Sequence, residues 1–326
     1  MNTLPSENII YTNGLSKHFD GVSAVENLTL EIPLGIIFGF IGPSGCGKTT
    51  SVRLLLGIYK PDNGDIEVLG HRPEKFSHRE RAQIGYMPQQ FILYPELDVW
   101  ENMNFVASLY GYPLRRKERL EELLELVELT GQEHKKVRNL SGGMKNRLSL
   151  ATSIIHKPRL LFLDEPTAGI DPMLRRKFWD YFQQLKKQDR TLFVTTQYVG
   201  EAAYCDYVGI MMNGRLVDVD TPEGLRRKSL GGEVIHLQCA DYLSAEQLEK
   251  VMQQPFVEDG QARNLADRVL ELIVDDAGKT LPALLEYCNR ENITVVSAEE
   301  YAPPFDDIFV QLIEQQYQQQ KESAVA

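Results

Sequence analysis

A glycine-rich segment that joins an apolar run to a helix-forming run constrains the fold of this 326-residue chain more than any other feature. The apolar run, residues 36–41, has the length of a buried β-strand, and residues 51–56 have a helical pattern. The residues between them are Gly42, Pro43, Ser44, Gly45, Cys46, Gly47, Lys48, Thr49 and Thr50. The spacing Gly-x-x-x-x-Gly-Lys-Thr between a strand and a helix predicts a phosphate-binding loop.

Each residue type in this loop suits the binding of a nucleotide's phosphates. Glycines adopt backbone angles that let successive N–H groups point at one anion, and the following helix adds its positive end. The Lys48 ammonium supplies a positive charge, and the Thr49 hydroxyl is a hard oxygen ligand for Mg²⁺. The alternative is a glycine-rich turn with an incidental lysine. The strand before the loop and the helix after it favour the phosphate site, so we expect the phosphates of a nucleotide and Mg²⁺ as ligands.

The charge balance and the cysteines narrow the classes of partner. Lys and Arg number 35 against 46 Asp and Glu, which gives a net charge of −11 and argues against a nucleic-acid partner. The four cysteines lie far apart in the sequence and form no CxxC pair, so we expect reduced thiols rather than disulfides or a zinc site. No segment has the apolar length of a membrane span or the pattern of an export signal, which predicts a cytoplasmic protein.

Residues 8–230 read as one α/β domain around the phosphate-binding loop. Short strand patterns before and after the loop predict an antiparallel β subdomain beside a P-loop core. Residues 91–155 become helical and predict a helical insertion. Within it, Leu120, Leu123, Leu124 and Val127 share one face of a predicted helix at residues 118–129.

Residues 233–320 form a second, smaller domain after a glycine linker. Strand and helix patterns follow in the order β-α-β-β-α-β, with one short strand placed near residues 256–257 and a final helix at about 305–319. This is the element order of a ferredoxin-like α+β domain.

Two further segments carry residue types that would complete a nucleotide site. Asp164 and Glu165 follow the apolar run 160–163, so they stand at the carboxyl end of a buried strand, where open α/β sheets bind ligands. Asp164 suits Mg²⁺, and Glu165 suits activation of a water. Ser141, Gly142 and Gly143 open a helix and offer backbone N–H groups to an anion. Taken alone, the first pair is an acidic loop and the second group an N-cap.

These motifs occur in the order found in one family: over residues 8–230 the chain resembles the nucleotide-binding subunit of an ATP-binding-cassette (ABC) transporter. The motifs that carry the resemblance are residues 42–49, Gln89, residues 140–144, residues 160–165, residues 168–171 and the strand end 195–196. The C-terminal region resembles the accessory domain of drug- and polysaccharide-type exporter cassettes, with residues 304–309 similar to that family's closing helix.

The resemblance implies roles for residues that the motifs alone do not assign. Phe19 would stack on adenine, although by itself it reads as a minor core residue. Gln89 would contact Mg²⁺ and the attacking water, and Asp171 would shape a dimer seam. Ser141 and Gly143 would bind the γ-phosphate held by a second subunit, identical or different. The permease would be a separate membrane protein that holds the chain at the inner face of the membrane.

Gln197 departs from the family's pattern, which has histidine at this position. A glutamine amide can donate a hydrogen bond to the γ-phosphate, but it does not titrate near neutral pH. We therefore expect ATP binding with slowed and less pH-dependent hydrolysis, catalysed with Glu165 and Gln89. The alternative is a neutral substitution.

Other functions compete with transport. Residues 91–97 are the expected docking surface for the permease, although their apolar side chains also fit packing of the helical insertion. A soluble cassette ATPase linked to nucleic acid or ribosomes would resemble this chain at the ATP site, but such proteins usually carry two cassettes or a long coiled coil. A scaffold that binds ATP without turnover is supported only by Gln197 and opposed by Glu165.

Overall fold

The computed structural model describes residues 8–113, 115–255, 257, 262–264 and 268–325. It divides into two compact units, Met1–Val219 and Asp220–Ala326. Among the described residues, no helix is both long and apolar enough to cross a lipid bilayer.

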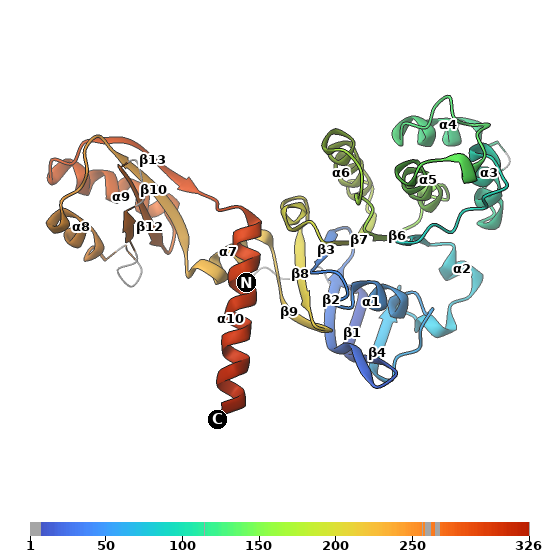
Figure 1. Ribbon diagram of the computed structural model, residues 1–326, viewed down its shortest axis with the longest axis horizontal. Helices are drawn as coiled ribbons and strands as arrows, with labels where there is room; N and C mark the ends of the chain where they lie inside the picture. The colour runs from blue at the N-terminus through green and yellow to red at the C-terminus, as the bar shows by residue number, and fades with distance from the viewer. Residues whose placement is uncertain (1–7, 114, 256, 258–261, 265–267, 326) are drawn as a thin grey trace. The chain divides into compact units, whose positions relative to one another are not determined.

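The first unit contains two sheets and the helices that cover them (Figure 1). Its strands are β1 (Asn8–Phe19), β2 (Val22–Pro33), β3 (Ile37–Ile41), β4 (Asn63–Val68), β5 (Ile84–Met87), β6 (Leu160–Asp164), β7 (Thr191–Thr196), β8 (Tyr207–Met212) and β9 (Arg215–Asp220). Its α-helices are α1 (Lys48–Leu55), α2 (His78–Arg81), α3 (Val99–Leu109), α4 (Lys117–Leu126), α5 (Gly142–Ile154) and α6 (Pro172–Lys186). Three 3₁₀ helices span Pro73–Lys75, Val137–Asn139 and Val199–Tyr204.

The larger sheet is the P-loop core that the sequence predicts. Its order is β5-β6-β7-β3-β8-β9, and β5, β6, β7, β3 and β8 pair in parallel. Every residue of β3, β6 and β7 is buried, as expected of parallel strands covered on both faces. The antiparallel sheet, of order β2-β1-β4, is the predicted β subdomain. Helix α1 contacts strands of both sheets, so the loop before it lies at their junction.

Helices α3, α4 and α5 form the predicted helical insertion, and α5 also contacts β5 and β6 of the core. The apolar face predicted at residues 118–129 is confirmed: Leu120, Leu123, Leu124 and Val127 are buried. Helix α3 begins with a capping box in which the Asp98 carboxylate accepts from the Glu101 N–H.

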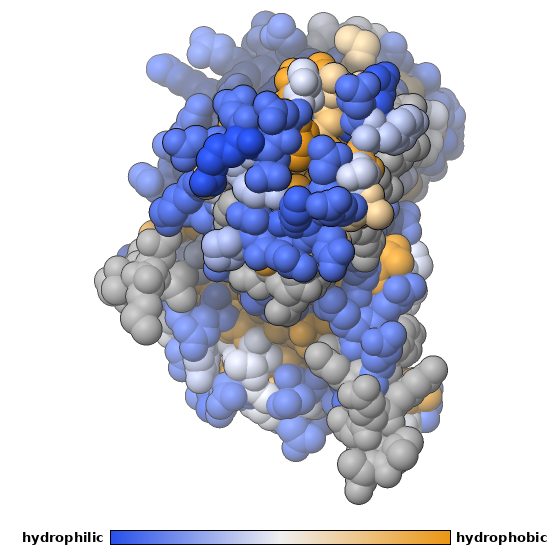
Figure 2. All heavy atoms as spheres, turned by 90° about the vertical axis from the view of Figure 1, so that its left-hand side faces the viewer, coloured by the Kyte–Doolittle hydropathy of each residue, from blue (hydrophilic) through white to orange (hydrophobic). Residues whose placement is uncertain are grey.

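Within its described residues, the second unit has a four-stranded antiparallel sheet. Its elements are α7 (Pro222–Leu230), β10 (Glu233–Cys239), α8 (Ala245–Met252), β11 (Ala262–Asn264), β12 (Val269–Val274), α9 (Ala277–Arg290), β13 (Val295–Tyr301) and α10 (Phe305–Val325). The sheet order is β11-β12-β10-β13. One face of the sheet packs with α8 and α9 around a core that includes Ile235, Leu237, Leu272 and Leu284. The surface in Figure 2 is largely hydrophilic, with hydrophobic side chains in small groups.

Two predictions about this region differ from the structure. The strand predicted near residues 256–257 is wrong: Val257 lies in a bend, Phe256 lies outside the described residues, and the short strand is β11 at Ala262–Asn264. The predicted boundary between residues 230 and 233 differs from the division at Val219 and Asp220. The reason is that α7 packs against α10, where the Ser229 hydroxyl donates to Gln311 Oε1 at 2.8 Å.

Candidate active site

The phosphate-binding loop follows the carboxyl end of β3, and two of its glycines have no room for a side chain. A Cβ at Gly42 would lie 2.1 Å from the Met211 carbonyl oxygen. A Cβ at Gly47 would lie 2.3 Å from the Ala24 carbonyl oxygen, and the φ angle of 111° at Gly47 also favours glycine. The turn directs the chain into α1, whose first residue is Lys48. The loop is therefore shaped by backbone approach, as a phosphate cradle requires.

The Lys48 ammonium is held inside this loop. Its Nζ donates to the carbonyl oxygens of Gly42 at 2.6 Å and Pro43 at 2.9 Å, and the residue is only 5% exposed. A buried ammonium needs such acceptors, because desolvation penalises the charged form. The charge is thus fixed beside the backbone that would surround a phosphate.

Asp164 is a buried carboxylate at the end of β6, and it offers one satisfied and one free oxygen. Its Oδ1 accepts from the Thr195 hydroxyl at 2.5 Å and from the Thr49 hydroxyl at 3.2 Å. Its Oδ2 is buried, and among the described residues it has no hydrogen-bond partner. A buried oxygen without a donor fits a divalent cation, and Thr49 adds a second hard oxygen ligand. The residues present therefore fit Mg²⁺.

Glu165 has a left-handed backbone and is joined to Gln89. Its φ angle is +55°, and its N–H donates to the carbonyl oxygen and to the hydroxyl of Thr195, each at 3.1 Å. Gln89 Nε2 donates to Glu165 Oε2 at 3.2 Å. The structure thus brings together Glu165 and Gln89, which are 76 residues apart in the sequence.

Gln197 directly follows β7 and contacts the phosphate-binding loop. The Ser44 hydroxyl donates to Gln197 Oε1 at 2.9 Å. Since the amide oxygen is the acceptor, the NH₂ group of this side chain is left to donate to a ligand. Gln197 therefore lies where a group that contacts a bound phosphate would be needed.

Ser141, Gly142 and Gly143 stand apart from the loop. Ser141 is the N-cap of α5 and accepts from the Met144 N–H at 3.3 Å, which is the structural role that its pattern also allows. Among the described residues, no hydrogen bond joins residues 141–143 to the loop at 42–50. The group is an N-cap within one chain, and its binding role stays a prediction.

Asp171 is the N-cap of α6. Its carboxylate accepts from the N–H groups of Met173 at 3.1 Å and Leu174 at 3.0 Å, and the bond from Leu174 is the main cause of its lowered pKa. Met173 beside it is 86% exposed. Asp171 thus has a clear structural role, while an exposed apolar side chain stands next to it.

Phe19 and Cys46 were also predicted near the nucleotide. The Phe19 ring is 40% exposed and packs edge-on against Tyr59 with ring centroids 5.2 Å apart, so it is not a fully buried core residue. Burial raises the pKa of the Cys46 thiol, although the Lys48 charge acts in the opposite direction. Cys46 is therefore a small packing residue. All four cysteines are buried and unpaired.

Two residues at the site make contacts that sequence reasoning did not assign. Thr195 holds both Asp164 and Glu165, yet a hydroxyl at a strand end carries no signal until the pairing of β6 with β7 is known. Asn146 is buried, and its Nδ2 donates to the carbonyl oxygens of Pro166 and Ala168, each at 3.2 Å. It ties α5 to the segment after Glu165. Its position one turn into a helix gave no hint of this contact.

Comparisons with known proteins agree with this geometry. A family model described as ABC transporter matches residues 25–168. "Probable multidrug ABC transporter ATP-binding protein YbhF" of Escherichia coli strain K12 is 36% identical over 230 residues, which are 70% of this chain and 40% of YbhF. The chain thus spans less than half the length of that relative. "Daunorubicin/doxorubicin resistance ATP-binding protein DrrA" of Streptomyces peucetius is 34% identical over 316 residues, 96% of this chain and 94% of DrrA.

A solved structure shares the fold of the first unit. It is the dimeric post-hydrolysis structure of the ATP-binding cassette MJ0796 with bound ADP and Pi. The TM-score is 0.60 at 23% identity, and the match covers 65% of this chain and 98% of that one.

Proposed function

Because this chain belongs to the ABC transporter family, we propose that it is an ATP-binding and ATP-hydrolysing subunit that works with a separate membrane permease. One observation carries the proposal: the Lys48 ammonium follows the carboxyl end of β3, and the Asp164 and Glu165 carboxylates stand at the carboxyl end of β6, two parallel strands that both pair with β7. A charge-neutralising loop, a cation ligand and a general base are the groups that phosphoryl transfer to water requires.

Each residue has a distinct task in this proposal. Lys48 and the N–H groups of residues 42–49 bind the β- and γ-phosphates. Thr49 and Asp164 would hold Mg²⁺, with Gln89 as a further ligand, and the bound cation would supply neutralisation of phosphate charge. Glu165 orients and deprotonates the attacking water, with Gln89 fixing its carboxylate. Gln197 donates its amide N–H to the γ-phosphate. The ring of Phe19 stacks on adenine.

A second copy, or a related subunit, completes the site. Ser141, Gly142 and Gly143 have no hydrogen bond to the loop within the described residues of one chain, so they suit the phosphate bound by a partner. The exposed side chain of Met173 beside Asp171 supports a seam between subunits at this point. ATP would hold two cassettes together, and hydrolysis would release them.

An exposed apolar surface after Gln89 suits the permease. Phe91, Ile92 and Tyr94 are 42%, 72% and 46% exposed, and the Tyr94 ring packs against Phe105 with centroids 4.7 Å apart. Exposed apolar side chains that are rigidly held favour a protein interface. Through it the chain would be held at the cytoplasmic face of the membrane.

The second unit supports an exporter. Its strand order, β11-β12-β10-β13, fits a ferredoxin-like accessory domain within Asp220–Ala326. The names of YbhF and DrrA, a multidrug and a drug-resistance protein, point in the same direction. A nucleic-acid or ribosome-linked role is not favoured.

ATP hydrolysis by the purified chain tests this function. We expect Mg²⁺-dependent release of phosphate, loss of ATP binding in Lys48→Ala, and loss of turnover with retained binding in Glu165→Gln. The Glu165→Gln variant should also form an ATP-dependent dimer in sedimentation velocity. Equal Mg-ATP affinity of Lys48→Ala and the unaltered protein would overturn the proposal.

A further inference from the structure

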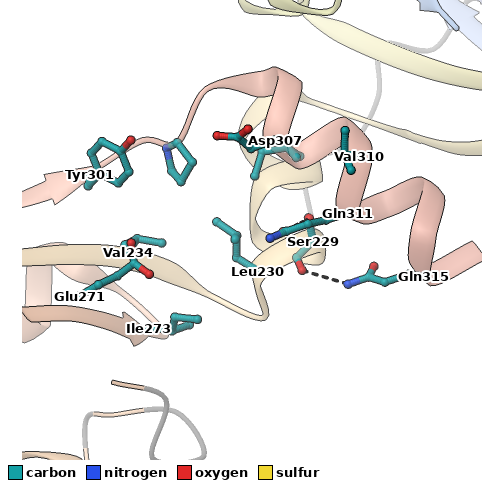
Figure 3. Close-up of a pocket in the computed structure, with 12 residues that line it drawn as sticks. Ser229, Leu230, Val234, Glu271, Ile273, Tyr301, Asp307, Val310, Gln311 and Gln315 are labelled. Carbon is teal, nitrogen blue, oxygen red and sulfur yellow. Dashed lines mark hydrogen bonds between the residues drawn. The ribbon is translucent and has the colours of Figure 1, made fainter. Parts of the chain in front are cut away.

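The second unit contains a cavity that the proposed ATPase does not use. It has a volume of about 620 Å³ and lies between the strands β10, β12 and β13 on one side and the helices α7 and α10 on the other (Figure 3). The opposite face of the same sheet is the one packed against α8 and α9. A volume of this size is typical of small-molecule sites.

The helical wall of the cavity is held in place by hydrogen bonds. The Ser229 hydroxyl donates to Gln311 Oε1 at 2.8 Å, and Gln315 Nε2 donates to the Ser229 carbonyl oxygen at 3.0 Å. Arg226 Nε donates to the Pro303 carbonyl oxygen at 3.4 Å, and the buried side chain of Ile308 packs in the same wall. The cavity is therefore bounded by fixed elements.

The lining combines apolar side chains with negative charge. Val234 and Ile273 are nearly buried on the strand side, whereas Val310 on α10 is 53% exposed. Glu271 and Asp307 are the carboxylates, and the described lining includes no lysine, arginine or histidine. An apolar surface with two carboxylates, of which Glu271 also lies within hydrogen-bond distance of His236, favours a positively charged ligand with an apolar body.

The two carboxylates are presented differently. Glu271 Oε2 lies 3.1 Å from His236 Nε2, and the His236 ring stacks on Tyr301 with centroids 3.9 Å apart. This arrangement fixes the Glu271 carboxylate and the Tyr301 ring on the strand side. Asp307, in the first turn of α10, directs its carboxylate from the helix toward the strands (Figure 3). A cation between them would meet both charges and an aromatic ring.

From this lining we propose that the cavity of the second unit binds an amphipathic organic cation. The apolar body would lie against Val234, Ile273 and Val310, and the positive charge would face Glu271 and Asp307. This inference does not depend on ATP hydrolysis, because none of the residues that carry it belongs to the nucleotide site.

Binding of tetraphenylphosphonium to the full chain tests the proposal, measured by isothermal titration calorimetry. Tetraphenylborate, which has the same shape and the opposite charge, is the matched probe. We expect the cation to bind and the anion not to bind. Glu271→Gln combined with Asp307→Asn should weaken cation binding about tenfold, since two partly exposed charges are removed without a change of shape.

Three controls make the outcome decisive. Asp306→Asn removes a neighbouring charge outside the cavity and should leave affinity unchanged. Asp307→Asn alone should weaken binding in the same direction if the double variant does not fold. Lys48→Ala should bind the cation as the unaltered chain does, which separates this proposal from the ATPase. Equal binding of the two probes, or an unchanged affinity in the double variant, would overturn it.

Discussion

At the scale of single residues, Gln197 places an amide that does not titrate where the family has a histidine. Its amide oxygen accepts from Ser44, so one side chain connects the end of β7 with the phosphate-binding loop. The side chain of glutamine does not titrate near neutral pH, whereas that of histidine has an ordinary pKa of about 6.5. We therefore expect the side chain at this position to decide whether the rate of the proposed hydrolysis responds to pH.

Gln197→His should raise kcat about tenfold, less than the roughly 10²–10⁴-fold of a full general acid–base group because glutamine already donates a hydrogen bond, and should leave ATP affinity unchanged. The rate of the variant should change between about pH 6 and 8, while that of the unaltered chain stays flatter. Steady-state phosphate release across this range measures both effects. Gln197→Ala is the control and should be slower than either. An unchanged rate in Gln197→His would contradict the assigned role.

Thr195 carries a second prediction at this scale. Thr195→Val keeps the shape but removes the hydroxyl that donates to Asp164 Oδ1 and accepts from the Glu165 N–H. A buried charged acceptor without this donor should cost about 1–3 kcal/mol of unfolding free energy. Denaturant titration monitored by the fluorescence of Trp100 and Trp179 measures this free energy, because both tryptophans lie in the first unit. Thr195→Ser, which restores the hydroxyl, should recover most of the loss.

At the scale of elements, a half-buried histidine just after α5 is hydrogen-bonded to β5. His156 Nε2 donates to the Ile84 carbonyl oxygen at 3.0 Å, and its ring stacks on Tyr110 with centroids 3.7 Å apart. Burial lowers the pKa of His156 from 6.5 to about 4; the Arg190 charge adds to this, and the Ile84 carbonyl opposes it. The helical insertion is therefore anchored to the core by a neutral imidazole.

This contact predicts a pH-dependent stability. As pH falls below 6.5 the unfolded chain binds a proton at His156, while the folded chain stays neutral until about pH 4, so stability is lost across this window. Between pH 7.5 and 5 the loss should be about 2 kcal/mol. His156→Gln, which keeps a donor but does not titrate, should lack this part of the loss. Tryptophan-monitored denaturation at both pH values checks it, and an equal loss in both proteins would refute the assignment.

The elements that sequence reasoning predicts well are those with a strong local pattern. The buried strand at 160–164 and the apolar face of residues 120–127 follow from runs and spacings within a few residues. Strand β11 lacks such a pattern, and its position is determined by its pairing with β12. The sequence therefore predicts this strand too early in the chain. The role of Thr195 was likewise invisible, because it depends on the register between β6 and β7.

At the scale of the whole molecule, the exposed residues after Gln89 should decide whether the chain joins a membrane complex. Ile92→Glu places a charge on a side chain that is 72% exposed, so it should cost little stability and should prevent co-purification with the permease from detergent-solubilised membranes. Ile58→Glu, at a side chain that is 55% exposed elsewhere in the first unit, is the matched control. Basal ATPase activity should be unchanged in both, and retained co-purification of Ile92→Glu would place the interface elsewhere.

The backbone conformation of Glu165 reduces the stability of the folded protein, whereas its carboxylate is the proposed general base. The positive backbone φ angle at Glu165 costs conformational free energy, and this cost is smaller for asparagine than for glutamate. Glu165→Asn should accordingly resist denaturant better than the native chain while it loses turnover. The side chain that the proposed hydrolysis requires at this position is therefore the one that makes the folded protein less stable.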